Sequence, residues 1–253
     1  GAVRSRIRLA KSLGEALEGA IHAQEAVSER VEVKREAFRD MDALASPQAV
    51  LASSSSTLPA SAFADGLSGR RRCLVAHPLN PPHLVPLVEL VPAPWTDPDA
   101  VRRTRALMES VGQEPITMHK EVAGFIVNRL QVALLNEAFA LIEDGCITPQ
   151  DLDKAITHGL GLRWSVVGPF ETIDLNAARG LRHYVEIFGA KYFDMMKSRG
   201  APRPWDERVV TEVDRAMRAT LPLTDIPSRQ AWRDRQLTRL AVLRASPEAE
   251  QDS

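Results

Sequence analysis

Apolar and polar positions follow two different patterns along the chain. Up to Met118, short apolar runs of strand length alternate with stretches of helical spacing. Between Val31 and Leu44, apolar residues recur at intervals of three or four, which predicts an amphipathic helix. Strands and helices that alternate with short connections are typical of a parallel sheet. We therefore expect an α/β domain in this half of the chain.

The expected strands of this domain are short and mostly apolar. They cover residues 20–27, 49–52, 73–77, 85–91 and 115–118. The expected helices cover residues 12–20, 31–44, 59–64 and about 98–111, and either Asp97 or Asp99 can cap the last of them.

Only helical spacing is found beyond about residue 120. The stretch from Phe125 to Glu143 carries apolar residues along one side and is soon followed by Gly145, which predicts a long helix with a glycine after its end. Thr148 and Pro149 are typical of the cap and the first position of a further helix. We expect an all-helical second domain, with a disordered tail at residues 246–253.

Charge and composition narrow the class of protein. Lys and Arg number 32 against 33 for Asp and Glu, so the net charge of −1 gives no reason to expect a nucleic-acid or membrane partner. No apolar run approaches the roughly 20 residues that span a bilayer. Cys73 and Cys146 lie in apolar contexts without paired spacing, which favours buried, reduced thiols. We expect a soluble, cytoplasmic protein in which Arg70, Arg71 and Arg72 form a solvated loop.

A histidine and a carboxylate stand out between Cys73 and Val91. His77 ends one apolar run, and Glu89 lies inside the next. A charged Glu89 in a buried strand needs a partner that offsets its desolvation, and His77 is the obvious candidate. A carboxylate that fixes the tautomer of a histidine and stabilises its cation forms a general acid–base pair.

Ser56 and Asn128 extend this chemistry. A hydroxyl and an amide can hydrogen-bond a substrate oxygen, and together with His77 they suit the interconversion of an alcohol and a ketone. Each residue also has a purely structural interpretation. A histidine at a strand end is commonly a core residue, Asn128 can cap the long helix, and a serine run is commonly a loop.

The sequence lacks the motifs of serine hydrolases, metal sites and dinucleotide-binding turns. No serine lies in a Gly-x-Ser-x-Gly elbow, and no His, Cys or carboxylate cluster has the spacing of metal ligands, so we expect no metal. The dinucleotide fingerprint Gly-x-Gly-x-x-Gly is absent too. The nearest approach, Gly159-Leu-Gly161, lies among helices rather than after a strand.

Several segments together resemble the 3-hydroxyacyl-CoA dehydrogenase superfamily. They are residues 53–58, 76–81, 87–91 and 124–130. The closer likeness is to the lambda-crystallin branch, which includes L-gulonate 3-dehydrogenase, and it is carried by residues 18–25, 77–92, 120–125 and 229–234.

The resemblance implies a fold and a division into domains. We expect an incomplete Rossmann-like, NAD-binding domain at residues 1–119 and a helical domain for substrate binding and dimerisation at residues 120–245, followed by the tail. The family resemblance further implies a homodimer, built on the helix that starts at Phe125.

The resemblance also assigns roles around the reacting atoms. His77 would take the proton from the C3 hydroxyl of a 3-hydroxy acid while hydride leaves for NAD, and Glu89 would support His77. Ser56 and Asn128 would hydrogen-bond the reacting oxygen. Asn80 would order the loop after His77 and help bind the substrate.

Further roles concern the cofactor and the choice of substrate. Glu25 and Lys34 match positions that approach the cofactor in relatives. Arg163 resembles a residue of branches that act on free carboxylates, and an arginine can hold a carboxylate with two hydrogen bonds. A solvated Arg163 is an equal alternative.

One part of the family pattern does not match this sequence. In the family, a strand, a Gly-rich turn and a helix precede the first segment seen here, and they hold the pyrophosphate of NAD. We therefore expect weaker NAD binding by this chain. The alternatives are an L-gulonate-like dehydrogenase, a 3-hydroxyacyl-CoA or carnitine dehydrogenase, and a non-catalytic, crystallin-like structural protein.

Overall fold

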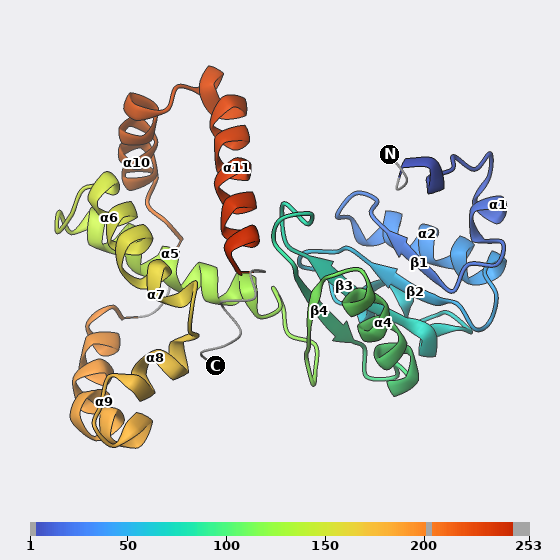
Figure 1. The fold of residues 1–253 in the computed structure, drawn as a ribbon, viewed down its shortest axis with the longest axis horizontal. Helices are drawn as coiled ribbons and strands as arrows, with labels where there is room; N and C mark the ends of the chain where they lie inside the picture. The colour runs from blue at the N-terminus through green and yellow to red at the C-terminus, as the bar shows by residue number, and fades with distance from the viewer. Residues whose placement is uncertain (1–3, 201–203, 245–253) are drawn as a thin grey trace. The chain divides into compact units, whose positions relative to one another are not determined.

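The computed structural model describes residues 4–200 and 204–244 (Figure 1). The predicted disordered tail at 246–253 lies outside the described residues. The described residues from Arg4 to Leu130 and from Trp232 to Arg244 form one compact unit, which we call the sheet unit. Residues Gln131 to Ala231 form a second, which we call the helical unit. The predicted boundary between residues 119 and 120 stays a prediction.

The sheet unit contains a five-stranded sheet whose strands lie side by side in chain order. They are β1 (His22–Glu25), β2 (Val50–Ser53), β3 (Cys73–Pro78), β4 (Leu87–Pro92) and β5 (Glu114–Thr117). Strands β3 and β4 pair antiparallel, and the other neighbours pair parallel. All of the predicted strands are confirmed.

Helices cover both faces of this sheet. They are α1 (Leu13–Leu17), α2 (Val31–Leu44), α3 (Ser61–Ala64) and α4 (Pro98–Ser110), and short 3-10 turns lie at Arg4–Arg6 and Arg70–Arg72. Phe38 of α2 and Phe63 of α3 pack with Leu51 and Val75 on one face. Ala100 of α4 packs with Leu90 on the other face. Asp97 caps α4 as predicted, because its carboxylate accepts a hydrogen bond from the N–H of Asp99.

Every described element after β5 is helical, as predicted. The elements are α5 (Val127–Glu143), α6 (Pro149–Ala155), a π-helical turn (Ile156–Leu160), α7 (Gly161–Trp164), α8 (Pro169–Leu175), α9 (Gly180–Ser198), α10 (Glu207–Thr220), a 3-10 turn (Leu223–Asp225) and α11 (Ile226–Arg244). Helix α5 begins two residues later than expected, because Gly124 and Phe125 have the left-handed φ angles 74° and 53°. The fold is thus a mostly parallel α/β sheet followed by helices, and no described helix could cross a membrane.

Two predictions about side chains were wrong. Arg72 is buried rather than solvated, because its guanidinium donates to Asp42 Oδ1 at 2.7 Å and to main-chain oxygens of the α2–β2 connection. Cys73 is buried, but Cys146 is exposed, because it follows the last turn of α5 rather than lying inside an element.

Candidate active site

The antiparallel pairing of β3 and β4 brings the proposed acid–base pair together. His77 lies directly opposite Glu89 in the ladder, and residues paired in this way have neighbouring side chains. His77 Nδ1 is 2.8 Å from Glu89 Oε2. The Glu89 side chain is 0% exposed. The predicted partnership between the buried carboxylate and His77 is therefore observed.

Main-chain donors occupy the other oxygen of Glu89. The N–H groups of Ile126 and Val127 donate to Oε1 at 2.8 and 3.0 Å. They are free to do so because the first N–H groups of a helix have no partner within it. Burial raises the pKa of Glu89, but the hydrogen bonds from His77, Val127 and Ile126 outweigh burial and hold that pKa below its ordinary value. Glu89 is therefore ionised at neutral pH.

The second ring nitrogen of His77 has no hydrogen-bond partner among the described residues. The side chain is 9% exposed, and the ring of Phe125 packs against it with centroids 5.7 Å apart. When Nδ1 carries the proton that is shared with Glu89, Nε2 is an open acceptor. The arrangement can thus accept a proton from a bound ligand at one defined atom.

Ser56 and Asn128 also lie together. Asn128 Nδ2 donates to the main-chain oxygen of Ser56 at 2.8 Å. The Ser56 side chain is exposed, and its hydroxyl makes no hydrogen bond within the described part of the chain. The amide therefore orders the loop after β2, while the hydroxyl is available to a ligand.

Glu25 and Lys34 form a buried ion pair rather than an open site. Lys34 Nζ lies 3.1 and 3.2 Å from the two carboxylate oxygens of Glu25, and Ser53 Oγ donates to Glu25 Oε2 at 2.6 Å. The Lys34 side chain is 1% exposed, and the Glu25 side chain is 2% exposed. The pair connects the end of β1 to α2 and β2, next to the loop that carries Ser56.

Glu29 is a residue of this region that the sequence analysis missed. Its Oε2 lies 3.2 Å from Lys34 Nζ, and its Oε1 accepts hydrogen bonds from the loop after β2. Burial raises its pKa, but hydrogen bonds from Ser55, Thr57 and Lys34 outweigh burial and lower the pKa to about 2. The signal in the sequence was a carboxylate between a strand and the next helix, with a run of hydroxyl residues after the neighbouring strand.

The two proposed substrate residues stand apart from these contacts. Asn80 is exposed in the loop after β3, and Arg163 is exposed in α7 of the helical unit. The described residues provide neither side chain with a hydrogen-bond partner. Their predicted roles stay predictions.

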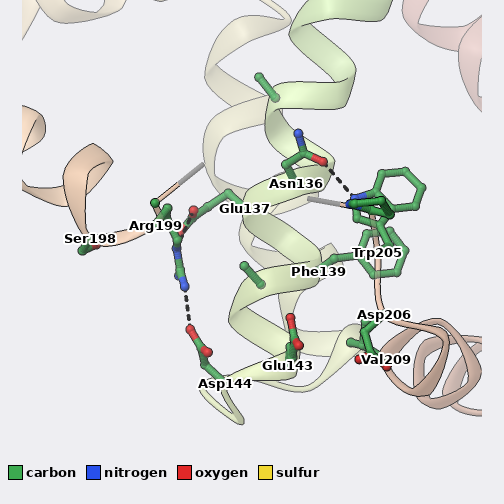
Figure 2. Close-up of a pocket in the computed structure, with 14 residues that line it drawn as sticks. Asn136, Glu137, Phe139, Glu143, Asp144, Ser198, Arg199, Trp205, Asp206 and Val209 are labelled. Carbon is green, nitrogen blue, oxygen red and sulfur yellow. Dashed lines mark hydrogen bonds and ion pairs between the residues drawn. The ribbon is translucent and has the colours of Figure 1, made fainter. Parts of the chain in front are cut away.

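A cavity of about 520 Å³ lies within the helical unit, beside α5 (Figure 2). Arg199 donates to Glu137 at 2.8 Å and to Asp144 at 2.5 Å, and the Trp205 indole donates to Asn136 Oδ1 at 2.8 Å. Figure 2 shows Arg199 directed toward these carboxylates. Because its guanidinium is already paired with two anions, we assign this cluster to helix packing rather than to binding an anionic ligand.

The polar groups near His77 share one face and one end of the sheet. Glu25 pairs with Ser53 and His77 pairs with Glu89, all of them near the carboxyl ends of β1, β2 and β3. In α/β sheets, ligands bind at this edge. The described residues contain no cluster of three or more His, Cys, Asp or Glu side chains that could hold a metal.

Two family models match the chain in succession. The model "3-hydroxyacyl-CoA dehydrogenase, NAD binding domain" matches residues 1–122, and "3-hydroxyacyl-CoA dehydrogenase, C-terminal domain" matches residues 124–220. The carboxyl edge fits a nicotinamide cofactor and an alcohol, because it presents the free Ser56 hydroxyl and the open His77 Nε2. Glu25, the predicted cofactor residue, lies at the same edge with Lys34 bound to it, and the cofactor roles of both stay predictions.

Individual relatives agree with these models. The chain is 42% identical to lambda-crystallin of Oryctolagus cuniculus over 242 residues, 95% of this chain and 76% of that protein. It is 37% identical to L-carnitine dehydrogenase of Pseudomonas sp over 97% of this chain and 76% of that protein. The structure resembles 5-formyl-3-hydroxy-2-methylpyridine 4-carboxylic acid 5-dehydrogenase, an NAD+-dependent dismutase, with a TM-score of 0.79 and 28% identity over 94% of this chain and 76% of that chain. The chain therefore belongs to the 3-hydroxyacyl-CoA dehydrogenase family of NAD-dependent oxidoreductases, within its lambda-crystallin branch.

Proposed function

We propose that this chain oxidises the C3 hydroxyl of a 3-hydroxy acid to a ketone, with His77 as the general base. The observation that carries the proposal is the 2.8 Å contact between His77 Nδ1 and the buried Glu89, which leaves His77 Nε2 open at the ligand-binding edge of the sheet. NAD, when bound, supplies the hydride acceptor.

Residues of the chain would accept the proton that leaves the C3 hydroxyl. Nε2 of His77 takes the hydroxyl proton, and the imidazolium that forms is stabilised by the ionised Glu89. The Ser56 hydroxyl hydrogen-bonds the reacting oxygen. Asn128 would donate the second N–H of its Nδ2 to the same oxygen, while the first N–H is bound to the Ser56 carbonyl and fixes the loop.

For the substrate we propose an L-gulonate-like acid whose carboxylate is held by Arg163. Arg163 is exposed on α7 and carries a guanidinium that suits a carboxylate. Carnitine is also a 3-hydroxy acid with a free carboxylate, and the 37% identity to an L-carnitine dehydrogenase supports it as the second candidate. A 3-hydroxyacyl-CoA is the third.

The test is an assay of NADH formation with L-gulonate, carnitine and a 3-hydroxyacyl-CoA. It should be run on this chain and on the same chain preceded by a Gly-rich strand–turn–helix unit. We expect gulonate to have the highest kcat/KM, and Arg163→Ala to raise its KM about tenfold or more through loss of a charge-assisted contact. Arg182→Ala, a change of another exposed arginine, is the control. An unchanged KM in Arg163→Ala would remove Arg163 from the proposal.

A non-catalytic, crystallin-like role is the alternative of another class, and the similarity to a lambda-crystallin supports it. It predicts no NADH formation with any of these acids in either protein. If His77→Gln kept full activity, the protein would still be an enzyme, but His77 would not be its general base.

We also infer a homodimer that forms through the helical unit, and a cytoplasmic location. The dimer is supported by apolar side chains on the part of α5 that belongs to the helical unit, such as Val132 and Leu134, which are 45% and 37% exposed. The location is supported by two cysteines that form no disulfide.

A further inference from the structure

The loop that carries Ser56 has little apolar packing of its own. It follows β2, and Ser56 and Thr57 at its tip are exposed. Leu58 is the residue of this loop that packs, partly buried, against the core. Something other than burial must therefore hold the Ser56 hydroxyl in one place.

A single carboxylate oxygen of Glu29 accepts hydrogen bonds from several N–H and hydroxyl groups of this loop. The N–H groups of Ser56, Thr57 and Leu58 lie 3.1, 2.9 and 3.3 Å from Glu29 Oε1. The hydroxyls of Ser55 and Thr57 donate to the same atom at 2.6 and 3.0 Å. Successive main-chain N–H groups that converge in this way form a nest for an anion, and here the anion is a side chain of the protein.

The second carboxylate oxygen of Glu29 is held by a buried lysine. Lys34 Nζ is 3.2 Å from Glu29 Oε2 and also contacts Glu25, and the Lys34 side chain is 1% exposed. On the opposite side of the loop, Asn128 Nδ2 holds the carbonyl of Ser56. Both polar groups of the Ser56 main chain are thus held, and the side chain is left free.

We propose that Glu29 is a positioning residue that fixes the Ser56 hydroxyl for the reacting oxygen of the substrate. The inference rests on the proposed function, which it deepens. Glu29 acts through Ser56 and does not itself meet the reacting atoms. The negative charge is essential, because a glutamine at this position would offer one acceptor to the loop and turn an NH2 group toward Lys34, which is also only a donor.

The test is a double-mutant cycle with Glu29→Gln, Ser56→Ala and the double variant, assayed in whichever of the two proteins above is active. Glu32→Gln, a change of an exposed carboxylate on α2, is the matched control. We expect Glu29→Gln to lower kcat about tenfold in the wild-type background and less than about twofold when Ser56 is already alanine. A merely structural role would lower kcat by equal factors in both backgrounds, and that result would overturn the proposal.

Amide hydrogen exchange provides a measurement that does not need activity. The amides of Ser56 and Thr57 should exchange about tenfold faster in Glu29→Gln than in the wild type or Glu32→Gln, because they lose their charged acceptor. The N–H of Leu58 keeps a second acceptor, Ser55 Oγ at 2.9 Å, and should change less. Unchanged exchange would overturn the proposal. An inactive wild type would overturn the proposed function, and with it the catalytic part of this inference, while the exchange rates would still decide whether Glu29 holds the loop.

Discussion

Glu89 carries its charge in a place where charges are costly. Transfer of a carboxylate from water into a protein interior costs several kcal/mol, and its side chain is 0% exposed. His77 and two main-chain N–H groups offset this cost, since hydrogen bonds to charged groups contribute about 1.5–3 kcal/mol each. These contacts keep Glu89 ionised, and one of them places its carboxylate against the His77 ring, which must accept a proton in the proposed reaction.

Removal of this charge should therefore impair proton transfer more than folding. Glu89→Gln keeps the size of the side chain but cannot stabilise an imidazolium at His77. We expect kcat to fall about 100-fold or more, which is the usual contribution of general base catalysis. The measurement is the rate of NADH formation, with Glu114→Gln, at the exposed start of β5, as the control. Equal rates for Glu89→Gln and the control would contradict the pair.

Glu29 should make stability depend on pH in the acid range. Its pKa is about 2 in the folded protein against an ordinary value of 4.5. A carboxyl group with a lowered pKa stabilises the folded state above its ordinary pKa, and this stability is lost as the pH falls toward the folded value. The difference in unfolding free energy between the wild type and Glu29→Gln, measured in urea, should thus be largest at neutral pH and shrink between pH 4.5 and about 2. A difference that stays constant over this range would exclude the carboxylate as its source.

At the scale of elements, the spacing of apolar residues predicts those helices whose position is set by burial of one face. Helix α2 has the predicted bounds, Val31 to Leu44, because one apolar face must be covered. The start of α5 was misplaced, because apolar spacing does not reveal the left-handed φ angle of Phe125. Arg72 was misjudged and Glu29 was missed for another reason. The bonds of Arg72 to Asp42 and Ala49, and those of Glu29 to the loop after β2, join positions more than 20 apart in the sequence, so only the tertiary fold brings these groups together.

The roles of His77 and Glu89 could be approached from sequence because a charge inside an apolar run demands a nearby partner. The main-chain donors to Glu89 could not, since any residue supplies an N–H group. Ser56 was singled out together with its family segment, but its support by Glu29 depends on contacts between the β1–α2 connection and the loop after β2.

The π-helical turn Ile156–Leu160 yields a matched pair of glycine substitutions. A Cβ at Gly161 would lie 2.9 Å from the main-chain oxygen of Ile156, so Gly161→Ala must shift the backbone, whereas a Cβ at Gly159 meets nothing within 4 Å. We expect Gly159→Ala to be neutral or to stabilise by about 0.5–1 kcal/mol, and Gly161→Ala to destabilise by about 1 kcal/mol or more. Urea unfolding of both variants measures this. If the two variants were equally stable, the close approach at Gly161 would be wrong.

At the scale of the whole molecule, the two units differ in how they bury apolar residues. Both large clusters of buried apolar side chains lie in the sheet unit. Among the described residues of the helical unit, the buried apolar side chains are those of Ala138, Ile142, Pro149 and Val209. Many others on its helices, such as Phe193 and Met196, are more than half exposed. Surfaces of this kind are typical of subunit interfaces.

The proposed homodimer therefore makes a direct prediction. Sedimentation equilibrium should give roughly twice the chain mass of 27.9 kDa, because pairing would cover these apolar residues. Val132→Glu on α5 should shift the protein toward monomer, since it would place a charge inside the interface. Leu9→Glu, at a site that is 97% exposed, should not. A monomeric wild type would contradict the dimer.

The hydrogen bonds from Ile126 and Val127 to Glu89 have a consequence for genetics. A mutational scan that exchanges side chains leaves both N–H groups in place, so these positions would resemble ordinary residues at the start of α5. Proline alone among the standard residues has no N–H to donate. A selective intolerance of proline at positions 126 and 127, with broad acceptance of other residues, would be the mark that this part of the site leaves on the sequences of functional variants.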